Sequence, residues 1–289
     1  MSIKALTVSI VIPVYNEEHH IDGCLQAIAA QTVMPDEVIV VDNNCTDKTI
    51  EKARKFPFVK IVRETRQGHA PARNAGFDAA TSEIIGRIDA ESLIAKNWVE
   101  RLKFSFSDDS MAAVTGLGQT DFMPRLHFAH ARSTLACRGY YWNVHAYFNT
   151  ITTWGANMAV RQNWWQRVRK DVQSDDKLVH EDQDVALLIA GEGGIVKQDN
   201  QLLITTKGQT YLYFPKILHY LRLLYTTKQH HKHLGTFDKP TFQRLGFFHT
   251  LPGWLAGFVP GILFFLTGLL FWPLDAIMIE RIGSKKWLH

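Results

Sequence analysis

The chain has 289 residues and a formal net charge of +4. This length suits one large α/β domain with an appendage, and the three cysteines lack the spacing of a disulfide framework or a metal site. The basic charge is uneven, because residues 212–289 hold nine of the 32 Lys and Arg residues but only three of the 28 Asp and Glu residues. A modest positive charge near one end favours contact with a membrane surface, and we expect no nucleic-acid partner.

Four apolar runs near the beginning of the chain have the length of buried strands. They are residues 8–13, 37–41, 58–62 and 84–88. Segments with apolar residues at helical spacing separate them, so their order predicts βαβ units and a mostly parallel sheet flanked by helices. Parallel strands joined in this way end at one edge of the sheet, and ligands of open α/β sheets bind beyond that edge. The polar residues after these runs should therefore meet in one crevice.

The acidic pair Asp89 and Glu91 follows directly after the fourth run, with Ala90 between the two acids. Two carboxylates at a strand end, separated by a small residue, suit a hard divalent cation that holds a diphosphate. Taken alone, the triplet is equally compatible with a solvated acidic turn. The motifs at the other strand ends decide between these two interpretations.

Six motifs stand along the chain: SIVIPVYNEE at 9–18, VVDNNCTD at 40–47, ARNAG at 72–76, DAE at 89–91, GANMAVR at 155–161 and EDQD at 181–184. Together they resemble the ordered motifs of family-2-type inverting glycosyltransferases with the GT-A fold. The resemblance covers residues 6–205. It implies the Rossmann-like sheet of nucleotide-diphospho-sugar transferases and a nucleotide-diphosphate sugar as donor, with a UDP-sugar favoured.

The resemblance also implies which residues bind the donor nucleotide. They are Pro13, Tyr15, Glu17, Asp42, Arg73 and Asp89. Asp42 matches the acid that accepts a hydrogen bond from uracil, and the guanidinium of Arg73 is expected on the diphosphate. From the residues alone, Asp42 is also compatible with an Asx-turn or a helix cap, and Arg73 with a surface ion pair.

A divalent cation is implied at Asp89 and Glu91. Transfer from a nucleotide sugar leaves negative charge on the departing diphosphate, and a bound cation stabilises that charge. Carboxylates are hard oxygen ligands, so Mg²⁺ or Mn²⁺ is expected. The family usually has Asp at the second position, whereas here Glu91, longer by one methylene, supplies the oxygen ligands.

The second acidic cluster, residues 181–184, is expected to carry the catalysis. By resemblance Asp182 is the general base that takes the proton of the acceptor hydroxyl, and Glu181 is the second candidate. Acids in the first turn of a helix are also explained by the helix dipole, and that alternative stays open for Glu181 and Asp184. The residues expected on the acceptor side are Trp154, Gly155, Ala156 and Asn157.

The end of the chain predicts membrane contact. Residues 245–274 contain no Asp, Glu, Lys or Arg, and about 20 apolar residues suffice for a transmembrane helix. Pro252 and Pro260 permit a re-entrant form, and a buried core helix is the alternative. Residues 214–225 predict a basic interfacial helix, for which a helix packed on the catalytic domain is the alternative. Its apolar stripe is Phe214, Ile217, Leu218, Leu221 and Tyr225.

The run His230-His231-Lys232-His233 raises a second possible metal site. Adjacent histidines rarely face one ligand point together, so a solvated basic loop is favoured over a metal centre. No Gln-x-x-Arg-Trp motif of processive synthases follows the predicted base. The sequence therefore favours a single transfer over polymerisation.

We thus predict a GT-A catalytic domain over residues 1–210, a basic amphipathic interfacial segment over 211–244 and a hydrophobic transmembrane or re-entrant segment over 245–289. The predicted function is inverting sugar transfer to a hydroxyl of a lipid-linked or cell-envelope glycan. We expect the cell membrane as location, with the catalytic domain facing the cytoplasm. One alternative is a nucleotidyltransferase of related fold, although a Gly-rich basic loop is missing after the first strand. The other is a catalytically silent membrane scaffold.

Overall fold

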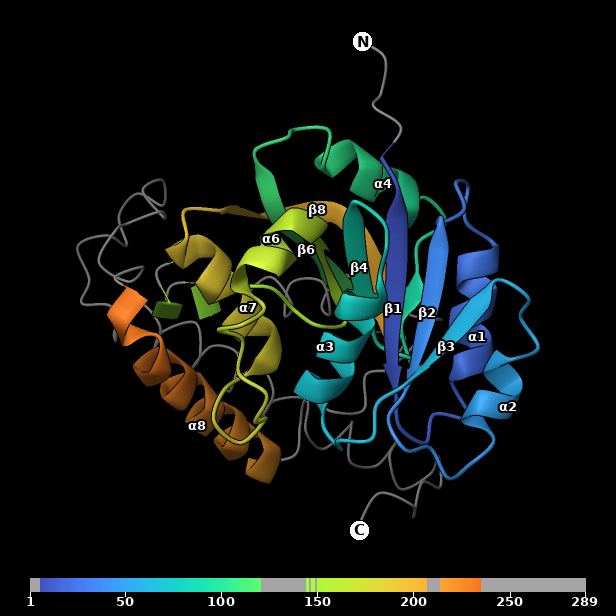
Figure 1. The fold of residues 1–289 in the computed structure, drawn as a ribbon, viewed down its shortest axis with the longest axis horizontal. Helices are drawn as coiled ribbons and strands as arrows, with labels where there is room; N and C mark the ends of the chain where they lie inside the picture. Colours follow the sequence, from blue (N-terminus) through green and yellow to red (C-terminus); the bar gives the residue numbers. More distant parts are fainter. Residues whose placement is uncertain (1–5, 121–143, 146, 149, 207–213, 235–289) are drawn as a thin grey trace, which may run out of the picture.

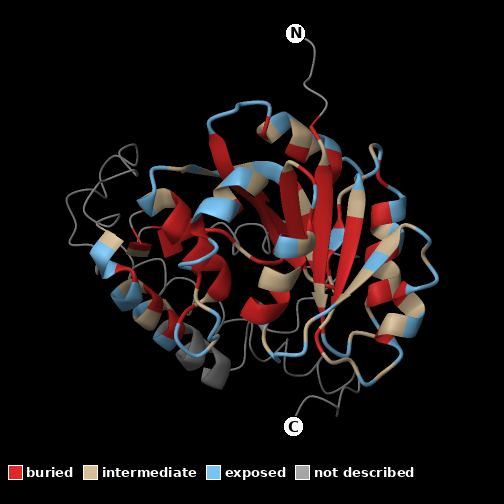
Figure 2. Cartoon of the chain, viewed as in Figure 1, coloured by how far each residue is buried: buried red, intermediate tan, exposed pale blue. Residues whose placement is uncertain are grey.

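The computed structural model describes residues 6–120, 144, 145, 147, 148, 150–206 and 214–234, with only the backbone of residues 120 and 214–221. Within these residues, one eight-stranded sheet lies between two layers of helices (Figure 1). The central strands are the most deeply buried part of the molecule (Figure 2). This is the α/β architecture that the alternation of apolar runs and helical segments predicts.

The strands lie in the order β3-β2-β1-β4-β7-β6-β8-β5. Their bounds are β1 (Val8–Val14), β2 (Glu37–Asp42), β3 (Val59–Arg63), β4 (Ile84–Ile88), β5 (Leu93–Ile94), β6 (Met111–Thr120), β7 (Asn157–Arg161) and β8 (Ile195–Thr206). The first four strands pair in parallel, as predicted. β7 runs against its neighbours β4 and β6, and β5 runs against β8, so the sheet is mixed while most of its strands share one direction.

Two helix layers cover the sheet. Their bounds are α1 (Ile21–Ala29), α2 (Thr49–Ala53), α3 (His69–Ala79), α4 (Trp98–Ser105), α6 (Gln162–Val168), α7 (Glu181–Gly191) and α8 (Phe214–His230), followed by the short helix η1 (Lys232–Leu234). One core contains buried residues of α1, α2 and α4, and the other contains buried residues of α3, α6 and α7. Along β1, Ile10 and Ile12 belong to the first core and Val11 to the second. Burial on both faces explains why β1, β2 and β4 read as mostly apolar runs.

The helix α3 lies unusually close to the sheet at Gly76. A methyl group at this position would overlap side-chain atoms of Val11 on β1 and Val41 on β2. Glycine therefore lets α3 pack directly on the two strands whose ends carry the first two sequence motifs. This contact fixes the start of α3, and with it Arg73, relative to the sheet edge.

The helix α8 runs alongside α7, on the side of the sheet away from α1 and α2 (Figure 1). Leu223, Thr227 and His231 follow one another at a spacing of four residues and are all buried. Tyr225, the last member of the predicted apolar stripe, is 58% exposed, whereas the other members lie where only the backbone is described. The described end of α8 thus packs on the catalytic domain, which was the alternative to an interfacial helix.

The predicted hydrophobic segment, residues 245–289, lies outside the described residues, as does the predicted boundary near residue 210. Among the helices that the structure describes, none is both long enough and apolar enough to cross a membrane. The membrane segment therefore stays a prediction.

Candidate active site

The parallel strands bring the sequence motifs to one edge of the sheet. Val14 at the end of β1 pairs with Asp42 at the end of β2. On the other side of β1, Val11 pairs with Arg87, so the Asp89 that follows β4 ends at the same edge. The strand ends that carry Asp42 and Asp89 therefore lie at one edge of the sheet, as predicted.

The loops after β1 and β2 are held together by short polar side chains. The Asn16 Oδ1 accepts a hydrogen bond of 2.8 Å from the Thr46 N–H, and the Asp47 Oδ2 accepts one of 3.0 Å from the Glu18 N–H. The Asp47 Oδ1 also accepts from the N–H of Thr49, the first residue of α2, at 2.9 Å. Burial alone would raise the pKa of the Asp47 carboxyl, but these hydrogen bonds lower it below its usual value.

Asp42 stabilises the turn that follows it, which the sequence offered as the alternative to a contact with the donor nucleotide. Its Oδ1 accepts a hydrogen bond of 2.9 Å from the Cys45 N–H. In the preceding loop Tyr15 is 52% exposed, and the carboxylate of Glu17 pairs with His20 at 2.8 Å. Pro13 lies within β1, beside Val41 of β2. Nucleotide contacts of Pro13, Tyr15, Glu17 and Asp42 remain predictions.

Arg73 is fully buried in the interior, so it is not the surface ion pair considered as an alternative. Its Nη1 donates to the Glu181 Oε2 at 2.9 Å and also to the Glu181 carbonyl oxygen. Its Nη2 has no hydrogen-bond partner among the described residues. The sequence predicted that this guanidinium contacts a diphosphate, and the structure instead gives it an internal acid as partner.

Arg87 is a site residue that sequence reasoning missed. It lies in the middle of β4, is almost fully buried, and pairs through Nη1 with Glu181 and through Nη2 with the Asp89 Oδ1 at 3.4 Å. The available signal was a single charged residue inside an apolar run, since a charge in a buried strand requires a partner. Arg87 thereby connects the acid after β4 with the acid cluster at the start of α7.

The glycine of the GANMAVR motif accommodates this arginine. A methyl group at position 155 would overlap the guanidinium of Arg87. The small residues here were predicted to let a ligand approach the backbone, whereas in the structure the approaching group is the Arg87 side chain. The Gly155 N–H in turn donates to the Asp182 Oδ2 at 2.7 Å.

Glu181 is enclosed between two guanidinium groups. One carboxylate oxygen pairs with Arg73 and the other with Arg87. Burial alone would raise the pKa of Glu181, but Arg87 and Arg73 lower it below its usual value. Both oxygens are therefore committed to ion pairs, which makes Glu181 the organiser of the cluster and a weaker candidate for the base than Asp182.

Asp182 is buried at the first turn of α7, with its side chain 4% exposed. Its Oδ1 accepts from the Gln183 N–H at 2.7 Å and contacts the His180 Nδ1, while its Oδ2 accepts from the Gly155 N–H. Burial alone would raise the pKa of Asp182, but His180, Arg87 and the Gly155 N–H lower it to about 2. The carboxylate is consequently ionised at neutral pH.

The residues predicted for the acceptor side have different environments. The Asn157 side chain is fully buried, donates to the carbonyl oxygens of Leu117 and Leu202 at 3.0 and 2.9 Å, and accepts from the Trp98 Nε1 at 2.8 Å. Every polar atom of the Asn157 amide is therefore engaged in the core, and the place of Asn157 on the acceptor side stays a prediction. Ala156 is also buried, and Trp154 is partly buried against the first core.

The two predicted metal ligands offer hard oxygen donors at the sheet edge. The Asp89 side chain is 41% exposed, and Glu91 is partly exposed two residues later. Among the described residues no group of three or more His, Cys, Asp or Glu side chains forms a complete metal site. Mg²⁺ is commonly held by one or two carboxylates together with substrate phosphates, so this donor set fits a cation that arrives with a diphosphate.

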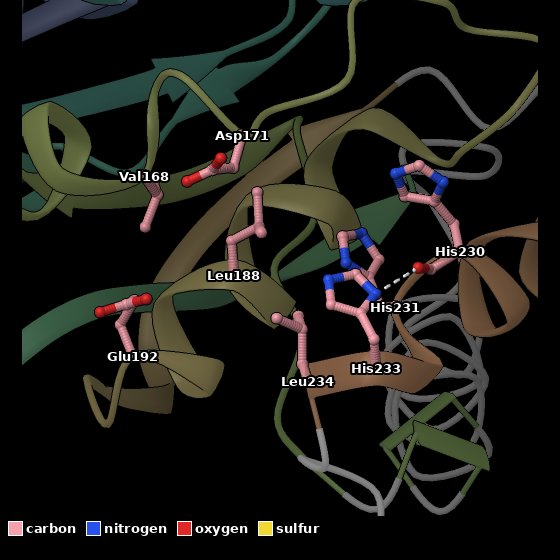
Figure 3. A pocket seen from close by; sticks show the side chains of 8 residues that line it. All are labelled: Val168, Asp171, Leu188, Glu192, His230, His231, His233 and Leu234. Atoms are coloured by element: carbon pink, nitrogen blue, oxygen red, sulfur yellow. Dashed lines mark hydrogen bonds between the residues drawn. The ribbon is translucent and has the colours of Figure 1, made fainter.

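The histidine run forms an anchor between helices. His231 and Asp184 are both fully buried, and the His231 Nε2 lies 2.7 Å from the Asp184 Oδ1. The His233 side chain turns back to the His230 carbonyl oxygen at 2.9 Å (Figure 3). These three histidines border a cavity of about 360 Å³ that also contacts Asp171 and Glu192. Within the described part of the chain they form no metal site, and His231 instead ties the end of α8 to α7.

Among the curated relatives, two match parts of this sequence as follows. Glycosyltransferase AglE of Haloferax volcanii is 34% identical over 116 residues, which cover 38% of this chain and 38% of that protein. The putative glycosyltransferase EpsH of Bacillus subtilis is 26% identical over 156 residues, which cover 47% of this chain and 45% of that protein. The chain thus spans less than half the length of these relatives.

Solved structures share the fold at low sequence identity. A mannosyltransferase of Pyrobaculum calidifontis, solved with GDP-mannose and Mn²⁺, aligns with a TM-score of 0.62 at 21% identity and covers 92% of this chain and 80% of that one. Glucosyl-3-phosphoglycerate synthase of Mycobacterium tuberculosis, solved with Mn²⁺, UDP-glucose and phosphoglyceric acid, aligns with a TM-score of 0.54 at 16% identity and covers 79% of this chain and 80% of that one. These likenesses confirm the predicted GT-A-like fold.

The family model described as Glycosyl transferase family 2 matches residues 9–172. The match contains the strand-end motifs with Asp42, Arg73 and the pair Asp89 and Glu91, and it stops before the acid cluster of α7. It covers more than half of the chain, and it agrees with the mixed α/β sheet and with the relatives. The chain belongs to glycosyl transferase family 2.

Proposed function

We propose that this protein is an inverting glycosyltransferase that moves a sugar from a nucleotide-diphosphate donor to a hydroxyl group. The observation that carries the proposal is the double ion pair of Arg87, which joins Asp89 on the donor side to Glu181 beside Asp182. One guanidinium thus links the acid proposed to lie near the diphosphate with the acid that precedes the proposed base. Family membership supports sugar transfer as the reaction class.

In the proposed reaction Asp182 takes the proton of the acceptor hydroxyl. The acceptor oxygen bonds to the anomeric carbon while the bond from that carbon to the diphosphate breaks, and the electron pair leaves on the diphosphate. A single displacement of this kind inverts the anomeric centre. Asp182 suits the role of base because it is ionised and held rigidly by the N–H groups of Gly155 and Gln183.

We propose Asp89 and Glu91 as ligands of Mg²⁺ or Mn²⁺. When bound, the cation would neutralise charge on the departing diphosphate. Burial raises the pKa of the Asp89 carboxyl above its usual value, and the Arg87 guanidinium at 3.4 Å offsets part of that effect. Structures of neighbouring fold that were solved with Mn²⁺ support this choice of ion.

The donor is proposed to be a UDP-sugar, bound by Asp42 and by the loop with Tyr15 and Glu17. Among the solved neighbours, two carry uridine donors, UDP-N-acetylglucosamine and UDP-glucose, and one carries GDP-mannose. The test is nucleotide release from these three donors by the full chain in detergent, with and without Mn²⁺. We expect UDP release to exceed GDP release and to need the cation. Failure of all three donors to bind or react would contradict the proposal.

We further propose a lipid-linked or cell-envelope glycan as acceptor and the cytoplasmic face of the cell membrane as location. The support is the uncharged run of residues 245–274 and the basic excess of residues 212–289. The full chain should sediment with membranes and resist extraction by high salt, because salt screens only its electrostatic attachment. Recovery of the full chain in the supernatant without detergent would contradict this part. No observation favours a nucleotidyltransferase or a silent scaffold.

A further inference from the structure

His180 is an additional residue in contact with the proposed base. It occupies the N-cap position of α7, where its extended backbone precedes the first helical turn. The backbone N–H of His180 donates to the Thr227 Oγ1 on α8 at 2.7 Å, and Thr227 is itself fully buried. The imidazole is 15% exposed, and its Nδ1 faces the Asp182 Oδ1 within hydrogen-bond distance. The ring is therefore held by Asp182 on α7, and the backbone of His180 by Thr227 on α8.

The contact distinguishes the two oxygens of Asp182. Oδ1 meets the His180 Nδ1 and also accepts from the Gln183 N–H at 2.7 Å. Oδ2 accepts from the Gly155 N–H at 2.7 Å. An ionised carboxylate has about four lone-pair positions, two on each oxygen. Among the residues that the structure describes, these three donors fill Oδ1 and leave one position on Oδ2.

Charged groups from several elements surround this pair. They are Glu181 on α7, Arg87 on β4, Asp89 after β4 and Arg73 on α3; beyond them, Asp184 interacts with Arg73, and the titratable His69 lies near Asp89 and Glu181. From α8, the described contact with His180 is the uncharged hydroxyl of Thr227. Burial alone would lower the pKa of His180, but the facing Asp182 carboxylate raises it above the usual histidine value.

We propose that His180 is a positioning residue for the transfer reaction: its Nδ1–H occupies the Asp182 Oδ1, so that Oδ2 alone receives the proton of the acceptor. This inference rests on the proposed function of Asp182 as base. The acceptor hydroxyl loses its proton to Oδ2, its oxygen bonds to the anomeric carbon, and the diphosphate departs with the electron pair.

The charge of the imidazole then controls the strength of the base. A doubly protonated His180 beside Asp182 stabilises the carboxylate and makes it a poor proton acceptor. A neutral His180 with its proton on Nδ1 keeps the hydrogen bond and removes that stabilisation. His180 is charged below its raised pKa and neutral above it. Turnover should therefore rise with pH as His180 loses its proton.

The test compares His180→Ala, His180→Asn and Asp182→Asn in the full chain. The Asn amide nitrogen lies where the imidazole Nδ1 lies, so His180→Asn can keep the hydrogen bond without titrating. The readout is nucleotide release to water from the best donor among UDP-glucose, UDP-N-acetylglucosamine and GDP-mannose, measured from about pH 6 to 9, the range in which a perturbed histidine titrates. The exposed His230, replaced by Ala, is the matched histidine control.

We expect His180→Ala to lower kcat by about 10²-fold, the loss typical of a slightly misplaced catalytic group, while the donor KM stays unchanged. His180→Asn should retain most of the turnover but lose the rise with pH, and His230→Ala should match the parent. Parental turnover and an unchanged pH profile in both His180 variants would overturn the inference while leaving Asp182 as the base. An equal loss in His180→Asn and His180→Ala would also overturn it. Parental turnover of Asp182→Asn would instead remove the proposed base, and the inference with it.

Discussion

Acidic side chains are held differently in two regions, the loops after β1 and β2 (the donor loops) and the start of α7. Around Asp42 and Asp47 the carboxylates are partly exposed and bound by N–H groups of nearby loops. Around Glu181 and Asp182 the carboxylates are buried and compensated by Arg73, Arg87 and His180, which come from other elements or the helix cap. The first arrangement is local and tolerant of water, whereas the second depends on the whole fold. Substitutions should therefore cost far more stability at the α7 cluster than in the donor loops.

The largest effect is expected from Arg87→Met. This change removes the charge that pairs with Glu181 and Asp89 but keeps most of the side-chain volume. Losing one partner of a buried ion pair typically costs roughly 3–5 kcal/mol, because the remaining charge stays buried. Denaturant unfolding measures the free energy. Lys55→Met is the control, since the Lys55–Glu51 pair is exposed and such pairs contribute at most about 1 kcal/mol. Equal losses in the two variants would remove the distinction between the regions.

An intermediate effect is expected from Gly155→Ala. The added methyl group overlaps the Arg87 guanidinium, and overpacking of this kind costs roughly 1–3 kcal/mol. Gly23→Ala in α1 is the matched control, because its methyl group would meet only the Leu93 side chain at 3.6 Å. Alanine is also the better helix former, by about 0.8–1.0 kcal/mol, so the control should be neutral or stabilised. A Gly155→Ala protein as stable as the parent would show that Arg87 can move without cost.

The smallest effect is expected in the donor loops, from Asp47→Asn. The pKa of Asp47 is lowered in the folded protein, so its hydrogen bonds contribute stability above the unfolded pKa, which is about 3.9, and lose it as pH falls through the folded pKa. Between pH 5 and pH 3, a window of about one unit around that value, the free energy of unfolding should fall less in Asp47→Asn than in the parent. Identical acid sensitivity of the two proteins would mean that Asp47 is not held in this way.

The sequence predicted the donor side of the fold well, because its signals are local. The strands β1, β2 and β4 are mostly apolar, and a polar motif follows each of them immediately. The antiparallel strand β7 carries no such signal, since its position depends on pairing with β4 and β6. The GANMAVR motif at the start of β7 was predicted to line the acceptor side. In the structure, the Asn157 side chain of this motif donates hydrogen bonds to carbonyl oxygens in the core.

The ion-pair cluster could not be predicted from the sequence, because its members are far apart along the chain. Arg87 and Glu181 are 94 residues apart, and Arg73 and Glu181 are 108 residues apart. If Glu181 only complemented the helix dipole, the alternative left open by the sequence, Glu181→Gln would be a mild change. With two buried guanidiniums on that carboxylate, the variant should instead lose stability. Activity of Glu181 variants is therefore meaningful only when expressed per folded molecule.

Asp182→Asn tests most directly whether the acid cluster holds the base of a sugar transfer. The substitution keeps the size of the side chain and removes its basicity, while Asp42 and Asp89 on the donor side are untouched. General-base catalysis contributes about 10²–10⁴-fold, so turnover per folded molecule should fall by that factor with donor affinity unchanged. Nucleotide release and donor binding, measured on the same preparation of the full chain, give both quantities. Parental turnover in Asp182→Asn would contradict the account and leave the cluster with a purely structural role.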